Sequence, residues 1–389
     1  MSAATANPSA PSNLRAELRA WLERYPPPRV VGAADADDAA RLRAWQRDLA
    51  ADRWVGIHWP VEYGGRGASP VELVAYHEEM ANAEVPPLLG RAGISLVGPT
   101  LMVHGTDAQR ARWMSRILSG DDVWCQLFSE PDAGSDLASL RTTATLIDDH
   151  YIVSGRKVWS SYAEFADWGI ALCRTDPNAP NHRGISMIAI DMRSAGVEVR
   201  PLRQMTGDHE FCEVVLDRVV VERANLIGPE HDGWRVANTT LANERGASFI
   251  WREQLLLERA LRRLAELVEE RGVANDPTVR QAIAAVHGDV QILAWWNRAT
   301  LAALARGGEI GLESSLVKLH WAGVSQRLAA LSLRVLGAHA LVTDDDEGPG
   351  AWVHSFLATR ANSIMGGTSE IQRTIIGERL LGLAREPRA

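Results

Sequence analysis

The chain has 389 residues, of which 46% are hydrophobic and 23% charged, so it is long enough to bury a large core and to form two or three domains. Its formal net charge of -8 opposes binding to a phosphate backbone, which excludes nucleic acid as the expected partner. No stretch reaches the roughly 20 apolar residues of a membrane span, and the start, MSAATANPSAPSN, lacks the basic and apolar regions of a secretion signal. We therefore expect a globular cytoplasmic protein that contacts no membrane.

The first 120 residues or so carry a helical pattern. The segment LRAELRAWLERY ends at three prolines, which cannot continue a helix. DDAARLRAWQRDLAADRW predicts a second helix, which ends in the Gly- and Pro-containing loop VGIHWPVEYGGRGASP. Ser69 with Glu72, and Thr106 with Gln109, have the spacing of capping boxes that begin two further helices. These signals predict an N-terminal helical domain over residues 1–121.

Between about Asp122 and Gly228 the apolar period changes from 3.6 to 2. Short, β-branched, alternating segments are separated by Gly, Pro and Asp turns: HYIVSGRKVW, RGISMIAIDM, GVEVRPL and CEVVLDRVVVE. They predict a middle antiparallel β domain, a barrel or sandwich, over residues 122–230. Its cysteines, Cys125, Cys173 and Cys212, lack the pairing of a disulfide or metal framework, so we expect them to be buried.

Long helical patterns return after Gly233. They break near NDP at 275–277, ARGG at 305–308 and TDDDEGPG at 343–350. These breaks predict a C-terminal bundle of four or five helices over residues 231–389. Helices, then strands, then helices, without βαβ alternation, indicate an α+β multi-domain chain.

Two short segments carry side chains suited to a flavin. In WCQLFSEPDAGSDLASL, Ser129, Gly134 and Ser135 provide hydroxyls and an unobstructed backbone, although such a loop alone is more often an ordinary turn. In GRKVWSS, Trp159 is able to cover a planar ring while Ser160 or Ser161 reaches its polar edge. An aromatic residue that closes the core at a strand end is an equally common alternative.

Taken together, these segments resemble a known family. SEPxAGSD followed by a Gly-x-Lys-x-Trp-Ser strand resembles the flavin-binding middle domain of the acyl-CoA dehydrogenases. PVEYGGRG resembles the family's N-terminal loop, GWRVANTTLANER its first C-terminal-domain helix, and GGTSEIQRTIIGERLLGL its C-terminal signature. The resemblance spans nearly the whole chain in the right order. It implies an enzyme that uses FAD to oxidise an acyl-CoA thioester to its α,β-unsaturated form.

The resemblance also assigns cofactor contacts. The loop that lines the flavin and begins the acyl-CoA site corresponds to Gln126, Phe128, Ser129, Gly134 and Ser135. Trp159 and Ser161 match the residues that stack on the isoalloxazine and bond to it, while Thr368 and Glu370 match contacts from the C-terminal loop. The stretches that reach FAD across a subunit interface correspond to Arg271, Arg334, Gly337 and Ala338.

The interface stretches depart from the family pattern. GVANDP replaces the usual Thr-Phe-Gly after Arg271, and Arg334 and Ala338 replace a glutamine and a second glycine. We expect a homodimer or homotetramer, because the family shares each cofactor between subunits. A heteromer with a different partner chain is the alternative that these departures leave open.

The catalytic base is displaced as well. Many members of the family carry a glutamate immediately before Gly-Thr-Ser, where this chain has Gly366 in MGGTSE. A smaller group, which resembles isovaleryl- and long-chain-type enzymes, carries the base on the first C-terminal-domain helix before an arginine, where this chain has Glu244 and Arg245. Helical spacing puts Glu244 on a largely uncharged stripe, so a boundary glutamate with a tertiary partner is the competing interpretation. The resemblance implies Glu244 as base and the Gly366 N–H as a donor to the substrate carbonyl.

Several alternatives remain open. Without a large side chain at position 366 we expect a bulky, branched or ring-bearing acyl group, with electrons passing to an electron-transfer flavoprotein. A related flavoprotein that uses oxygen or a carrier-protein thioester, and a non-catalytic subunit that completes a partner's FAD site, are the competing functions. A solvated hairpin is expected at Asp208, His209 and Glu210, and an exposed connection at the acidic run over residues 343–348. The histidines in helical patterns, His287 and His320, are expected to be packed.

Overall fold

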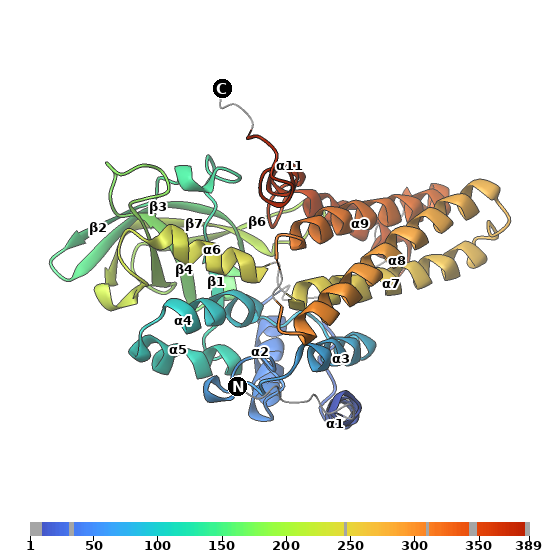
Figure 1. The fold of residues 1–389 in the computed structure, drawn as a ribbon, viewed down its shortest axis with the longest axis horizontal. Coiled ribbons are helices and arrows are strands. Elements are labelled where there is room, and N and C mark those ends of the chain that lie inside the picture. The colour runs from blue at the N-terminus through green and yellow to red at the C-terminus, as the bar shows by residue number, and fades with distance from the viewer. Residues whose placement is uncertain (1–9, 31–34, 245–246, 309–310, 342–347, 386–389) are drawn as a thin grey trace. The chain divides into compact units, whose positions relative to one another are not determined.

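The computed structural model describes residues 10–30, 35–244, 247–308, 311–341 and 348–385 (Figure 1). The chain forms two compact units. The β unit consists of residues 20–68 and 83–244, and the helical unit of residues 1–19, 69–82 and 245–389. The first helix, α1 (Ala10–Arg24), contributes residues to both units.

The β unit contains four of the described α-helices besides the end of α1: α2 (Ala36–Ala51), α4 (Gly98–His104), α5 (Asp107–Ser119) and α6 (Gly233–Glu244). The capping box predicted at the start of α5 is confirmed, because the Thr106 hydroxyl accepts from the Gln109 N–H at 3.2 Å and the Gln109 side chain accepts from the Thr106 N–H at 3.0 Å. A short π-helical segment, η2 (Gly93–Val97), precedes α4. α6 packs against η2, α4 and the sheet strand β5.

The eight strands of the β unit form one sheet. Their bounds are β1 (Trp124–Leu127), β2 (Thr143–Ile147), β3 (His150–Ser161), β4 (Trp168–Arg174), β5 (Ile185–Asp191), β6 (Val197–Leu202), β7 (Phe211–Glu222) and β8 (Leu226–Ile227). The order is β6-β7-β3-β2-β4-β5-β8, with β1 beside β4. The pairing is not purely antiparallel as predicted: β1 runs parallel to β4, from Trp124 opposite Trp168 to Leu127 opposite Ala171.

The parallel pair has a simple physical origin. The β2–β3 hairpin lies between β1 and β4 in sequence, and a connection of this length allows parallel pairing, which a tight turn does not. β4 and β5 are buried almost throughout, so they read as continuous apolar runs, whereas β3 and β7 alternate between buried and exposed positions. The three cysteines belong to the buried side of this unit, as predicted.

The described α-helices of the helical unit, besides the beginning of α1, are α3 (Pro70–Asn82), α7 (Ala247–Glu270), α8 (Pro277–Ala305), α9 (Ser314–Leu336), α10 (Pro349–Ala358) and α11 (Ser369–Thr374). The capping box at Ser69 is confirmed: its hydroxyl accepts from the Glu72 N–H at 3.3 Å, and Glu72 accepts from the Ser69 N–H at 2.8 Å. Asp276 caps α8 with Pro277 in its first turn, so the predicted break at NDP is confirmed.

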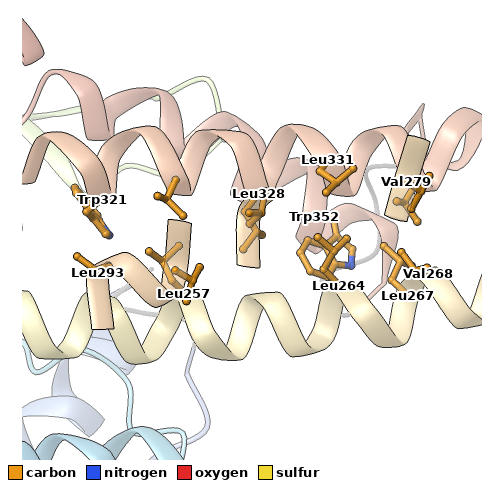
Figure 2. Packing of buried hydrophobic residues seen from close by; sticks show 14 of the residues in the cluster. Leu257, Leu264, Leu267, Val268, Val279, Leu293, Trp321, Leu328, Leu331 and Trp352 are labelled. Carbon is orange, nitrogen blue, oxygen red and sulfur yellow. The ribbon is translucent and has the colours of Figure 1, made fainter. Parts of the chain in front are cut away.

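Three long helices, α7, α8 and α9, lie side by side around one apolar core (Figures 1 and 2). Leu264, Leu293 and Leu328 project into this core from the three helices, and Trp352 of α10 packs with them. Truncating such a buried leucine to alanine costs about 2–5 kcal/mol. The bundle supports the short elements that follow α10, because α9 packs against both the 3-10 turn over residues 359–363 and α11.

Candidate functional site

The loop after β1 places the first group of predicted flavin residues. Gln126 lies in β1 and Phe128 directly after it, where the Phe128 ring is buried. Glu130 and Ala133 exchange backbone hydrogen bonds of 3.0 and 3.1 Å, which close the turn. The turn leaves Gly134 and Ser135 exposed. An added Cβ at Gly134 would meet nothing within 4 Å, so a ligand has free access to the backbone there.

A buried ion pair holds this loop against the sheet. Lys157 of β3 is 0% exposed, and its Nζ lies 2.8 Å from Glu130 Oε1, 3.1 Å from Phe128 O and 2.7 Å from Leu172 O. Three acceptors match the three N–H bonds of the charged ammonium. The Glu130 carboxylate also accepts from two backbone N–H groups, at 2.7 and 2.9 Å.

The electrostatics of the pair follow from burial. Burial lowers the pKa of Lys157, although the neighbouring carboxylate opposes that change. Burial alone would raise the pKa of Glu130, but the Lys157 ammonium and the hydrogen bonds to the carboxylate hold that pKa below its ordinary value. The pair therefore holds the loop in place, provided that both side chains stay ionised. The sequence alone assigns neither residue a role, although a lysine at an inward position of an alternating strand is a signal of such a pair.

An irregularity in β3 turns Trp159 outward. The pairing of β3 with β7 shifts register between Lys157 and Ser160, and Trp159 has a φ of +63°, a left-handed conformation that is unfavourable for such a residue. Its indole is 61% exposed and meets the Phe211 ring edge-on, with 6.0 Å between centroids. The alternative that this aromatic closes the core is therefore wrong.

The two flavin segments lie next to each other. The Val158 N–H donates to Ser129 O at 2.9 Å, which joins the strand before Trp159 to the loop after β1. Ser160 is fully buried, whereas Ser161 is half-buried, so Ser161 offers the more accessible hydroxyl. An exposed indole, an accessible hydroxyl and an open glycine backbone fit a planar isoalloxazine.

The C-terminal glycine turn belongs to the helical unit. Gly366 and Gly367 have φ of +63° and +91°, where a side chain is strained, and Thr368 caps α11 by accepting from the Ile371 N–H at 3.2 Å. Glu370 is exposed in the first turn of α11 and pairs with Arg373 at 3.2 Å.

The predicted interface residues gather at another part of the helical unit. Arg271 is exposed directly after α7, and Gly337 ends α9 with a φ of +57°. The Arg334 guanidinium donates to the Thr278 hydroxyl at the start of α8, which brings the end of α9 to the loop that follows Arg271. Arg334, Gly337 and Ala338 are all exposed, as a contact with a neighbouring subunit requires.

The backbone of Glu244 lies at the end of α6, in the β unit. Two hydrogen bonds hold α6 to α4 one turn earlier: Thr240 Oγ1 lies 2.8 Å from Thr100 Oγ1, and His104 Nε2 lies 2.8 Å from Thr239 Oγ1. Thr240 is fully buried. The side chain of Glu244, Arg245 as a whole, and the acidic run at 343–347 lie outside the described residues.

The predicted hairpin and the two helical histidines lie outside the flavin segments. Asp208 and His209 are exposed in the connection between β6 and β7, as predicted for a hairpin. His320 bonds to Asp289 O at 2.8 Å, but His287 is exposed, so the expectation that it is packed is wrong. Within the described part of the chain, no group of three or more metal-binding side chains gathers, and none of the helices is long and apolar enough to cross a membrane.

The β unit thus presents an exposed indole beside an open, hydroxyl-bearing loop, as a flavin-binding protein requires, and the helical unit contributes a helical bundle. Models of the three acyl-CoA dehydrogenase domains match the chain: the N-terminal domain over residues 10–121, the middle domain over 125–219 and the C-terminal domain over 231–381. The chain belongs to the acyl-CoA dehydrogenase family. It is accordingly an FAD-dependent oxidoreductase of acyl-CoA thioesters.

Similar proteins cover nearly the whole chain. Acyl-CoA dehydrogenase IpdE1 of Mycolicibacterium smegmatis is 37% identical in an alignment that covers 96% of this chain and 97% of the relative. FadE34 of Mycobacterium tuberculosis is 41% identical in an alignment that covers 91% of this chain but only 48% of that relative.

Two solved structures share the fold. The Tcur3481-Tcur3483 steroid ACAD has a TM-score of 0.85 and 29% identity, covering 98% of this chain and 99% of its own. The ChsE4-ChsE5 complex of Mycobacterium tuberculosis has a TM-score of 0.82 and 29% identity, covering 100% of both chains. Both names pair two chains, so assemblies of more than one subunit occur among the similar structures.

Proposed function

We propose that this chain dehydrogenates acyl-CoA thioesters whose acyl group is bulky, branched or ring-bearing, with Glu244 as the general base. The observation that carries the proposal is the glycine turn. The position that bears a glutamate in many relatives is Gly366, in a left-handed conformation that disfavours any side chain. Glu244, at the end of a helix that is anchored by Thr239 and Thr240, is the carboxylate that the family resemblance leaves for the role.

The chemistry assigns each group one task. The proton on the carbon α to the thioester is only weakly acidic, so its removal by Glu244 requires stabilisation of the charge that develops on the carbonyl oxygen. The backbone N–H of Gly366 donates to that oxygen, and this donor needs no side chain. FAD, when bound, would supply the acceptor for the β hydrogen. Trp159, Ser161 and the loop from Ser129 to Ser135 would hold its isoalloxazine.

The name of one similar structure supports a ring-bearing substrate, because it describes a steroid enzyme at 29% identity. A panel of straight, branched and steroid-side-chain acyl-CoAs, with bleaching of the flavin as readout, tests this part of the proposal. Faster bleaching by the steroid or branched thioesters is expected. A clear preference for short straight chains would contradict it.

The electron acceptor is proposed to be an electron-transfer flavoprotein. Substrate-reduced enzyme should therefore reoxidise rapidly with that protein and slowly in air. Rapid reoxidation by air alone would favour the oxygen-using alternative.

We further propose that a second, different acyl-CoA dehydrogenase chain completes the FAD site. The altered contacts at Arg334 and Ala338, and the two-chain complexes among similar structures, favour this arrangement. The chain produced alone should then retain little FAD, whereas co-production with a related chain should give a yellow complex. A yellow homo-oligomer with full activity would refute the second chain.

The base assignment is tested by Glu244→Gln, which keeps size and hydrogen bonding but removes the proton acceptor. In the yellow complex with the second chain, anaerobic flavin reduction should fall by about 10²- to 10⁴-fold while the protein stays folded and keeps its flavin. Glu253→Gln, on the neighbouring helix α7, is the matched control and should reduce its flavin at the parent rate. Parent-rate reduction in Glu244→Gln would show that another residue is the base.

A further inference from the structure

The glycine turn is held from behind by two buried polar side chains. Gln372 of α11 is 0% exposed, and its Nε2 donates to Gly366 O at 2.9 Å and to Gly367 O at 3.3 Å. Lys318 of α9 is 2% exposed, and its Nζ donates to Gly367 O at 2.6 Å. Both carbonyl oxygens of the turn are therefore engaged by side chains from two different helices.

Burying the Lys318 ammonium has a desolvation cost, which its hydrogen bond to the glycine turn helps to offset. A buried ammonium loses its hydration, and hydrogen bonds must offset that loss. A charge-assisted bond such as that from Lys318 is roughly twice as strong as a neutral one. Because α9 packs in the bundle core, the turn is tied to a helix that its neighbours hold on several sides.

The bonds restrict the turn where it would otherwise be free. Two adjacent glycines lose more conformational freedom on ordering than any other pair of residues, so an unrestrained turn would sample many orientations. Because each peptide group is planar, holding the carbonyls of Gly366 and Gly367 fixes the two peptide planes that follow the Gly366 Cα. The plane that contains the Gly366 N–H precedes that Cα, and the chain there is held separately, because the Ile364 and Met365 N–H groups donate to Ala361 O at 2.8 and 2.9 Å. With the chain held on both sides of Gly366, its N–H keeps one direction.

We propose that Lys318 and Gln372 are positioning residues that preorganise the Gly366 N–H as the donor to the thioester carbonyl oxygen. The inference rests on the proposed role of that N–H. A donor that is already aimed needs no reorganisation while charge develops on the oxygen, which is the main source of oxyanion stabilisation in enzymes. A purely structural staple would instead stabilise the helical unit and leave the chemistry unchanged.

The test compares Gln372→Leu with Gln326→Leu. Gln326 of α9 makes the same kind of amide bonds, to Thr359 O at 3.0 Å and Ser363 Oγ at 3.1 Å, but it does not hold the glycine turn. Both variants should lose similar stability against urea. Gln372→Leu alone should reduce its flavin about 10-fold or more slowly at saturating acyl-CoA, short of the ~10²- to 10³-fold loss for a deleted oxyanion donor.

A second readout is independent of turnover. Acetoacetyl-CoA ionises to an enolate, and a well-aimed donor lowers its apparent pKa when it binds. That apparent pKa should be higher in Gln372→Leu than in the parent and in Gln326→Leu. Lys318→Met should act in the same direction, and Lys318→Arg, which keeps a charged donor, should recover part of the loss.

The outcomes separate this inference from the proposed function. If Glu244→Gln abolishes reduction but Gln372→Leu and Lys318→Met match Gln326→Leu in rate and enolate pKa, the positioning role is refuted while the base assignment stands. If Glu244→Gln reduces its flavin normally, the base assignment fails whatever the glycine turn does. If Lys318→Met does not fold, Gln372→Leu decides the question.

Discussion

Replacing Lys157 with methionine tests the ion pair that holds the flavin loop. Methionine fills a similar volume but removes the ammonium, so the Glu130 carboxylate, 8% exposed, keeps only two backbone N–H donors. Two backbone carbonyls lose a donor at the same time. Removing one partner of a buried pair typically costs about 3–5 kcal/mol. We therefore expect the free energy of unfolding of the β unit to fall by about this amount.

The pH dependence gives this prediction its direction. In the parent, the pKa of Glu130 lies below its ordinary value of 4.5, so its contribution to stability is complete above pH 4.5 and disappears as the pH falls through the lower folded value. In Lys157→Met, burial without the ammonium raises the pKa of Glu130. Lowering the pH from 8 to 5 should then protonate the buried carboxylate and restore part of the stability that the variant lost.

Urea denaturation of the apoprotein at pH 8 and pH 5 measures both effects. Arg235→Met is the matched control, because Arg235 pairs with Asp232 at 2.6 Å with both side chains exposed, and such a pair contributes about 0–1 kcal/mol. The double variant Lys157→Met/Glu130→Leu should be more stable than Lys157→Met, since it leaves no buried charge. An equal loss of stability in Lys157→Met and Arg235→Met, or a loss that does not change with pH, would refute this account of the pair.

Three further predictions concern the site. Trp159→Ala should weaken FAD retention without lowering the urea midpoint of the apoprotein, because the indole is exposed; unchanged cofactor affinity in equilibrium dialysis would leave it without a flavin role. Gly366→Ala should lower the free energy of unfolding by about 1–2 kcal/mol, because position 366 is left-handed, and should also slow flavin reduction. The control Gly207→Ala, at a φ of +97° in the connection between β6 and β7, should lower stability alone. Equal reduction rates in the two variants would argue against the Gly366 N–H as the donor. Thr240→Val should lower the free energy of unfolding by about 1–3 kcal/mol, because it breaks a buried hydrogen bond between two hydroxyls. It should also slow flavin reduction, because α6 carries Glu244. A stopped-flow reduction rate equal to that of the parent would show that the position of α6 does not affect the reaction.

The order of elements was predictable from local signals. The capping boxes at Ser69 and Thr106, and the Asp-Pro start of α8, lie where the sequence places them, because capping depends on residues only three positions apart. The strands β3, β5, β6 and β7 were predicted as short β-branched segments, although β5 is buried almost throughout and does not alternate as expected. Strand pairing was harder to predict from the sequence. β1 pairs in parallel with β4 although a hairpin separates them in the chain, and nothing in either segment specifies that the two strands run in the same direction.

Most candidate flavin residues could be named from the sequence because they lie in two compact motifs. The residues that hold those motifs could not, because Lys157 meets Glu130 across the sheet, and Lys318 reaches the glycine turn from 49 residues away in the chain. Such contacts depend on burial, which converts an ordinary lysine into a costly charge that must find acceptors.

By itself, the sequence determined the kinds of elements, their order, the family and the absence of a carboxylate at Gly366, since each depends on residue identity or short-range spacing. Only the tertiary structure decided that α3 packs with α7 rather than with its neighbours in sequence, and that Trp159 faces outward. It also decided that two buried side chains hold the glycine turn. The physical reason is that burial and long-range packing arise from the whole fold, whereas propensity and capping act within a few residues.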